Sequence, residues 1–250
     1  CAYFDEAEEI LPGKRENVFK FEDDIIHKSN ERIKIDKSIS VDSWSQQYQN
    51  ERNHLFHFKS KSKLSLKKKI KLNDIAFDKI DHVTIPVFDL NNVYYADNDF
   101  NVYSKNLDNG KTNWIFRLEN EKTENLPFIG GFSLHKKELF ITSGLGNIYS
   151  LNAENGKILW KKKLLVQFSR PPLVFKNKII VVSDDNQTFA LNTKDGNLLW
   201  SHVGNLEEVS IIGGSKPVVT ENIVIISYSS GEIYALDHND GTLIWFDNVT

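Results

Sequence analysis

The feature that most constrains the fold of this chain is a block of 12 residues that occurs four times and ends each time in Trp. The copies align without a gap: YSKNLDNGKTNW (Tyr103–Trp114), YSLNAENGKILW (Tyr149–Trp160), FALNTKDGNLLW (Phe189–Trp200) and YALDHNDGTLIW (Tyr234–Trp245). A second matching element precedes each block: PVFDLNNVYYA from Pro86, FSLHKKELFIT from Phe132, PLVFKNKIIVV from Pro172 and PVVTENIVIIS from Pro217. Each repeat unit of about 40 to 46 residues is therefore predicted to be one supersecondary module.

The order of apolar runs and turn residues in each unit predicts four short antiparallel strands. Apolar and β-branched runs alternate with polar turns, and no stretch of the repeats shows the 3.6-residue periodicity of a helix. Each block contains a dipeptide typical of a two-residue type I′ hairpin turn, with positive φ at both central positions: Asn109-Gly110, Asn155-Gly156, Asp195-Gly196 and Asp240-Gly241. Four-stranded units of this length predict an all-β fold, a β-propeller with four blades in residues 86–250.

The repeated tryptophans are predicted to pack between neighbouring blades. A large flat ring placed once per blade fills the space between twisted sheets, and its indole N–H requires an acceptor there. We expect this role for Trp114, Trp160, Trp200 and Trp245.

The pattern A/S-L-N/D-x-x-x-G-x-x-x-W resembles the repeat of propellers of the pyrroloquinoline quinone (PQQ) type. It differs from WD40 blades, in which Asp follows the Trp, because here Ile115, Lys161, Ser201 and Phe246 follow it. Residues 166–250 resemble the BamB family of outer-membrane assembly lipoproteins, through VQFSRPPLVFKNKIIVVSDDNQTFALNTKDGNLLW and the later EVSIIGGSKPVV. That family closes eight blades into a ring, so the four repeats are expected to form half of one.

The BamB resemblance implies a non-catalytic scaffold that binds BamA, the barrel-bearing subunit of the assembly machinery. In the family, a loop contributes two apolar side chains and an Arg to that contact. Carried over by position, the apolar pair falls on Val209 and Ile211, and Ile212 stands where the Arg is expected. The alternative is that these residues pack inward. Arg170 of the Ser-Arg-Pro segment is a second candidate for partner binding, or else a structural Arg that bonds loop carbonyls. Unfolded barrel precursors are further expected partners, because they can add strands to exposed edges.

The first residue, Cys1, is interpreted as a lipidation site in a chain that has one Cys and no Met. Bacterial lipoproteins are cleaved before a Cys that then carries acyl chains, and several acyl chains anchor a protein stably. Residues 1–20 are then a tether, and LPGKRENVF within them is similar to a tether segment of the alphaproteobacterial branch. The expected location is the periplasmic face of the outer membrane, with which Ala2 agrees. The alternative is a fragment boundary that falls on a Cys.

Residues 21–85 match no repeat and are predicted to be irregular around Trp44. Within them, KLSLKKKIKL (63–72) alternates like one exposed strand and is our candidate for a ring-closing strand. Its lysines Lys67, Lys68, Lys69 and Lys71 either contact anionic lipid or protect an edge strand from aggregation.

Other function classes find little support in the sequence. Thirty-one basic against 34 acidic residues give a net charge of -3, which argues against nucleic-acid binding. We found no catalytic motif, metal-ligand cluster or cofactor motif. The alternative reading is a piece of a quinoprotein dehydrogenase, which holds PQQ over a Ca²⁺ on the propeller axis. A propeller sensor domain is a third class.

Overall fold

The computed structural model describes residues 34–60, 65–66, 68–72, 84–97, 99–118, 129–206, 214 and 216–249. These residues contain sixteen strands and no helix, and all strands lie in the compact unit Lys37–Thr250. No described helix therefore has the length and apolar character needed to cross a membrane. The strands of the first two sheets are β1 (Val87–Phe88), β2 (Asn92–Ala96), β3 (Asn101–Asn106), β4 (Thr112–Arg117), β5 (Ile129–His135), β6 (Glu138–Ser143), β7 (Asn147–Asn152) and β8 (Ile158–Lys163). Those of the other two are β9 (Leu173–Phe175), β10 (Lys178–Val182), β11 (Gln187–Asn192), β12 (Leu198–Val203), β13 (Val218–Thr220), β14 (Ile223–Ser227), β15 (Glu232–Asp237) and β16 (Leu243–Asn248).

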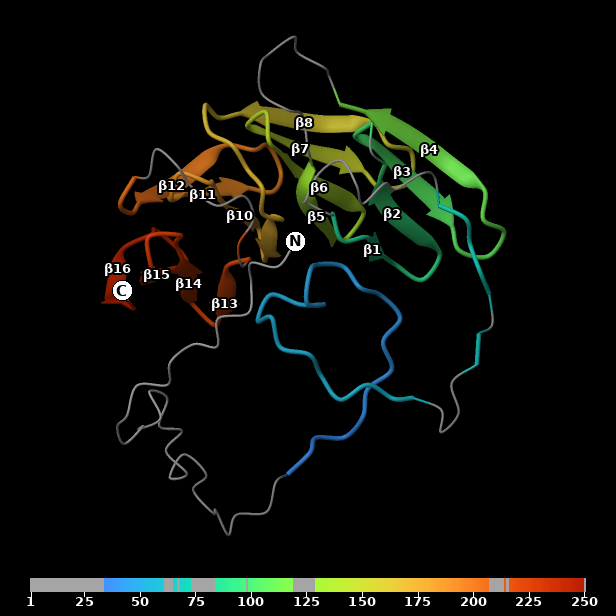
Figure 1. Cartoon of the computed structure of the whole chain (residues 1–250), viewed down its shortest axis with the longest axis horizontal. Coiled ribbons are helices and arrows are strands. Elements are labelled where there is room, and N and C mark those ends of the chain that lie inside the picture. The colour runs from blue at the N-terminus through green and yellow to red at the C-terminus, as the bar shows by residue number, and fades with distance from the viewer. Residues whose placement is uncertain are drawn as a thin grey trace, which may run out of the picture. The chain divides into compact units, whose positions relative to one another are not determined.

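Each predicted repeat forms one four-stranded antiparallel sheet whose strands pair in chain order. Figure 1 shows the four sheets following one another, with β1, β5, β9 and β13 on the inside and β4, β8, β12 and β16 on the outside. The predicted all-β fold, part of a PQQ-like β-propeller, is confirmed. We number the sheets as blades 1 to 4.

The hairpins between the third and fourth strands occur where we predicted them, but the predicted turn type is wrong. Of the Asn109-Gly110 pair, only the Gly has positive φ, at 71°. The loop is longer than two residues: Asn106 N–H donates to the Lys111 carbonyl, and Gly110 N–H donates to the Asn106 carbonyl, both at 2.9 Å. The Asn106 side chain also accepts from the backbone of Asp108 and Asn109, which stabilises the longer loop.

A β-bulge lies at the same place in every blade, one position after the residue that pairs with the Trp. In blade 3, Ala190 pairs with Trp200 and the register shifts between Ala190 and Leu191. A bulge increases the local twist of the strand pair. We therefore expect a locally increased twist beside the Trp in all four blades.

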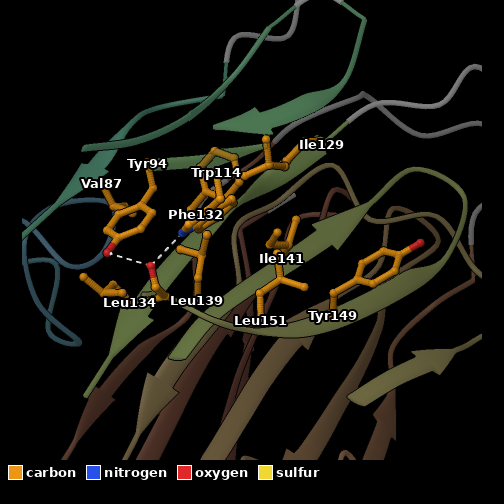
Figure 2. Packing of buried hydrophobic residues seen from close by; sticks show 12 residues of the cluster. Val87, Tyr94, Trp114, Ile129, Phe132, Leu134, Leu139, Ile141, Tyr149 and Leu151 are labelled. Atoms are coloured by element: carbon orange, nitrogen blue, oxygen red, sulfur yellow. Dashed lines mark hydrogen bonds between the residues drawn. The ribbon is translucent and has the colours of Figure 1, made fainter. Parts of the chain in front are cut away.

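Three of the four tryptophans join neighbouring blades as predicted. Trp114 Nε1 donates to the Ala153 carbonyl of blade 2 at 2.9 Å, and Tyr94 Oη donates to the same carbonyl at 3.4 Å (Figure 2). Trp160 donates to the Thr193 carbonyl and Trp200 to the His238 carbonyl in the same way. Buried apolar clusters combine residues of successive blades, so the hydrophobic core lies between the sheets.

Trp245 departs from the prediction, because its ring is 44% exposed, whereas Trp114 is 9% and Trp200 is 6% exposed. The physical reason is that no further blade covers it among the described residues. The other three rings each lie against the turn glycine of the following blade.

The candidate ring-closing segment contains no strand in its described residues, 65–66 and 68–72. It lies instead against the outer turn of blade 1. Lys68 Nζ donates to the Leu107 carbonyl at 2.5 Å, Lys105 Nζ donates to the Lys71 carbonyl at 2.9 Å, and Ile70 faces Gly110. Lys67 lies outside the described residues. Leu107 holds the same repeat position as Ala153, Thr193 and His238. The Leu107 carbonyl accepts from Lys68, whereas the carbonyls of the other three accept from the Trp of the preceding blade.

His238 lies at the contact between blades 3 and 4, where we expect it to make the fold sensitive to acid. Its ring is 1% exposed, packs edge-on against Phe175 at 5.1 Å, and has no hydrogen-bond partner for either nitrogen in the described structure. Burial lowers the pKa of His238 to about 4, and the positive charges of Lys178 and Lys176 add to the shift.

We expect stability to fall as the pH drops from about 6.5 towards 4, because only the unfolded chain then binds a proton at His238. Between pH 6 and pH 5 the loss attributable to this residue should be about 1 kcal/mol. Urea unfolding at both pH values, with wild type and His238→Ala, measures it; Ala occupies the equivalent position 153. An equally steep pH dependence in both proteins would contradict the assignment.

Candidate partner-binding site

The inner edges of all four blades are bonded to one segment of the chain, residues 44–53, which we call the axial segment. The third residue of each element that precedes a repeat block lies on an inner strand, and its backbone N–H donates to this segment. Phe88 donates to the Trp44 carbonyl, Leu134 to the Ser45 carbonyl and Val219 to the Glu51 carbonyl, at 2.7 to 3.0 Å. The axial segment therefore satisfies edge donors that face the inside of the blades.

The fourth of these donors, the Val174 N–H of blade 3, is bonded to a side chain of the axial segment. Gln46 is 5% exposed, and its amide forms both bonds of a strand-like pair with Val174. Val174 N–H donates to Gln46 Oε1 at 3.3 Å, and Gln46 Nε2 donates to the Val174 carbonyl at 3.0 Å. The backbone of Gln46 forms a bridge with Ser133 of blade 2. One residue thus connects blades 2 and 3.

Lys216 joins the axial segment to blade 4. Only 2% of Lys216 is exposed, and its Nζ donates to the carbonyls of Gln47 and Asn50 at 2.9 Å each, and to Gln46 Oε1 at 3.5 Å. Burial lowers the pKa of Lys216 to about 7, and Glu51 opposes the shift. A buried amine with three oxygen acceptors requires the axial segment to stay in place.

Lys216 lies at the start of blade 4, directly after the stretch that contains the predicted apolar contact residues. Val209, Ile211 and Ile212 fall in residues 207–213, which lie outside the described residues. The structure does describe both flanks of this stretch, which we call the 207–213 loop.

Arg170 packs against Gly214, the described residue at the C-terminal flank of this loop. It is 4% exposed, and its Nη1 donates to the Ser227 carbonyl at 3.3 Å. A side chain at Gly214 would lie 2.5 Å from Arg170 Nε, so the guanidinium packs directly against that glycine. Burial lowers the pKa of Arg170, while Asp184 and Tyr228 oppose the shift. Arg170 is thus buried in the structure, and it donates to the carbonyl at the end of β14.

Glu232 holds the N-terminal flank. Its carboxylate, 4% exposed, accepts from Asn205 N–H at 2.9 Å and from Asn205 Nδ2 at 2.7 Å. Burial raises the pKa of Glu232, but hydrogen bonds from Asn205, Ser230 and Tyr234 outweigh that effect and lower it overall. Gly204 packs against the Tyr228 ring. Both flanks of the loop are thus fixed by buried charged side chains.

The described residues do not fit the PQQ and Ca²⁺ of the alternative reading. They contain no group of three or more His, Cys, Asp or Glu placed to hold a metal ion. The inner strands, at the axis where that cofactor would sit, are bonded to the axial segment instead. No chemical step through such a group follows from this geometry.

The sequence did not identify the axial segment or Lys216 as important. Gln46 and Lys216 lie 170 residues apart, and residues 44–53 match no repeat. The sequence offers one indication, at Lys216: this residue directly precedes the Pro-Val-Val with which the fourth repeat begins. Cys1, and with it the whole predicted tether of residues 1–20, lies outside the described residues.

Comparisons with known proteins agree with the propeller fold. Residues 82–250 match the sequence model of the family described as outer membrane protein assembly factor BamB. No curated protein sequence matches significantly.

Many solved structures are similar, and the low identities of the three described here show the fold alone. BamB from Moraxella catarrhalis is 21% identical with a TM-score of 0.58, over 68% of this chain and 50% of that one. A europium-containing methanol dehydrogenase is 16% identical with a TM-score of 0.56, over 68% and 42%. A quinohemoprotein alcohol dehydrogenase from Comamonas testosteroni is 16% identical with a TM-score of 0.56, over 68% and 35%. The chain thus spans about half or less of the length of these proteins.

Proposed function

The chain belongs to the family of the outer membrane protein assembly factor BamB, and from this we propose that it is a non-catalytic scaffold of an outer-membrane β-barrel assembly machinery. The observation that carries the proposal is the family match over the whole propeller region. The anchored flanks of the 207–213 loop support it, because a binding loop on rigid flanks loses little entropy when it docks. The main partner is a BamA-like barrel protein.

Within this proposal, Val209 and Ile211 are the apolar contacts, and Ile212 extends them. A small cluster of desolvated apolar side chains commonly supplies most of the binding energy of an interface. Arg170 serves the contact indirectly, because its guanidinium is buried under Gly214. Lipidation at Cys1 and the tether of residues 1–20 place the propeller at the periplasmic face of the outer membrane.

Unfolded barrel precursors are proposed as secondary partners that pair with the outer edges of the blades. The outer strands β4 and β12 each pair with one other strand among the described residues. An extended peptide can add to such an edge through its backbone. The inner edges are already bonded to the axial segment, so we assign this pairing to the outside.

The alternative, a piece of a quinoprotein dehydrogenase, rests on similarity of fold. Reconstitution with PQQ and Ca²⁺, followed by a dye-reduction assay, separates the two proposals. A quinone absorption spectrum with turnover would overturn the scaffold proposal.

The partner contact is tested by changing both Val209 and Ile211 to Asp. Two buried charges in an apolar contact should weaken binding to the periplasmic region of BamA by about 100-fold or more. Isothermal titration of purified proteins measures the effect. Leu90→Asp is the matched control, because Leu90 is an apolar side chain, 68% exposed, in the turn between β1 and β2. Equal affinities of the double variant and wild type would exclude this contact.

A further inference from the structure

The buried apolar clusters of the described structure join each blade only to the next one. One cluster combines blades 1 and 2, another blades 2 and 3, and a third blades 3 and 4. The tryptophans of the first three blades follow the same rule, because each donates to the following blade. In a repeat protein whose units touch only their neighbours, a terminal unit can open while the others stay folded.

Blade 4 is the blade for which such separate opening is most expected. Its buried apolar residues belong to the one cluster that it shares with blade 3. All six residues of its outer strand β16 are exposed, whereas the tryptophans of β4 and β12 are buried. Contacts between neighbouring blades alone therefore leave blade 4 as the least supported of the four sheets.

The axial segment adds contacts to blade 4 that do not follow the neighbour rule. The Lys216 ammonium donates to the carbonyls of Gln47 and Asn50 at 2.9 Å each, and the Lys216 carbonyl accepts from Asn53 Nδ2 at 3.1 Å. The backbone N–H of Val219 adds a fourth bond to the segment, at 2.9 Å. Residues outside the repeats thus hold the start of blade 4.

The turn that makes these bonds has a fixed shape. Tyr48, Gln49 and Asn53 have positive φ values of 59°, 74° and 52°, which non-glycine residues adopt rarely unless neighbouring contacts hold them there. Asn50 Nδ2 donates to the His54 carbonyl at 2.6 Å, which closes the turn on itself. A turn constrained in this way resists extension, so it can couple the parts of the fold bonded to its two ends.

The first residues of the axial segment are bonded to the other three blades. Trp44 exchanges two backbone hydrogen bonds with Phe88 of blade 1, at 2.8 and 3.0 Å, and the Ser45 carbonyl accepts from blade 2. The Gln46 side chain pairs with Val174 of blade 3. Blade 4 is therefore connected with blades 1 and 2, although it shares no buried apolar cluster with them in the described structure.

We infer that the axial segment is a strap that couples blade 4 to blades 1, 2 and 3, with Lys216 as its main attachment, so that the four blades open as one cooperative unit. Contacts between the repeats do not supply this coupling, because they join neighbours only. The inference concerns the opening of the fold and does not depend on the proposed function.

Native-state hydrogen exchange of the full chain tests the coupling. In wild type, the most protected amides of β14 and β15 should have protection factors within about fivefold of those of β6 and β7, because one opening exposes them all. Lys216→Met keeps the length of the side chain and removes its donors. This variant should lower the protection of β14 and β15 about tenfold relative to β6 and β7, in the range of one or two lost hydrogen bonds.

Two results would overturn the strap. The first is a wild-type protein in which blade 4 is already more than about fivefold less protected than blade 2. The second is a Lys216→Met variant in which the ratio between the two blades stays as in wild type, because a lysine that only stabilises the fold as a whole lowers protection equally everywhere.

Lys105→Met is the matched control. Lys105 is also a buried lysine, 7% exposed, and its ammonium donates to a backbone carbonyl, that of Lys71, at 2.9 Å. It lies on β3 of blade 1, and Lys71 lies outside the axial segment. Its replacement is expected to leave the protection of β14 and β15 relative to β6 and β7 unchanged.

A second variant keeps the test decisive if Lys216→Met fails to fold. Asn53→Gly removes the side-chain bond to the Lys216 carbonyl, and Gly adopts the φ of 52° at this position without strain. We expect the protection of β14 and β15 relative to β6 and β7 to fall about threefold from its wild-type value, in the range of one lost hydrogen bond. An unchanged ratio in this folded variant would likewise contradict the strap.

Discussion

Replacing Trp200 with Ala is expected to lower the free energy of unfolding by about 3 to 5 kcal/mol, the usual loss for a deleted core aromatic side chain. The ring of Trp200 lies between blades 3 and 4, is 6% exposed, and belongs to an apolar cluster that combines both sheets. Its Nε1 donates to the His238 carbonyl at 3.1 Å, so the variant also leaves a buried carbonyl without its donor. The expected loss of stability therefore has two sources, the cavity left by the ring and the unpaired His238 carbonyl.

Trp245→Ala is the control, because Trp245 holds the same position of the repeat but is 44% exposed. We expect this variant to lose less than about half as much as Trp200→Ala, since the cost of a deletion follows the contacts that are lost. Urea unfolding followed by intrinsic fluorescence and circular dichroism measures both. Equal losses would show that the Trp stabilises its own blade and does not join two blades.

The second large effect is expected for Gly196→Ala. Gly196 has a φ of 69°, and a Cβ there would lie 2.7 Å from Cε3 of Trp160. The substitution combines backbone strain with displacement of a packed ring, and the sum should cost about 2 to 4 kcal/mol. The ring has little space to move, because Trp160 also packs against Phe140 and donates to the Thr193 carbonyl.

Gly110→Ala separates the two causes. Gly110 has nearly the same φ, 71°, but a Cβ there would meet only Ile70 Cγ2 at 3.9 Å, an ordinary contact. This control should therefore cost about 1 to 2 kcal/mol, the strain alone. Measuring both variants by urea unfolding gives the contribution of the contact between ring and glycine as the difference. A difference near zero would mean that the turn glycines serve the backbone only.

The repeat predicted the blades well because its information is local. Apolar alternation and turn residues decide where strands begin and end, and the third and fourth strands are six residues long in all four blades. The Trp contacts were predictable for a related reason, since a ring that recurs once per module must meet the next module. The turn type was missed because the Asn106 side chain bonds two backbone N–H groups and so stabilises a longer loop than Asn-Gly alone indicates.

The axial segment was not predictable, because its contacts are neither local nor periodic. Gln46 bonds Val174, 128 residues away, and Lys216 bonds Asn50 across 166 residues. Nothing in a polar stretch such as WSQQYQNER indicates which carbonyls will face four strand edges. Arg170 illustrates the same limit: its position in the Ser-Arg-Pro segment was identified, but its burial under Gly214 depends on packing between blades.

The most direct test of the scaffold proposal is co-purification of the full chain with BamA from chemically crosslinked outer membranes. We predict that affinity-tagged wild type recovers BamA, and that the Asp variant at Val209 and Ile211 recovers several-fold less at equal expression. Failure of the wild-type protein to recover BamA under crosslinking would contradict the proposal.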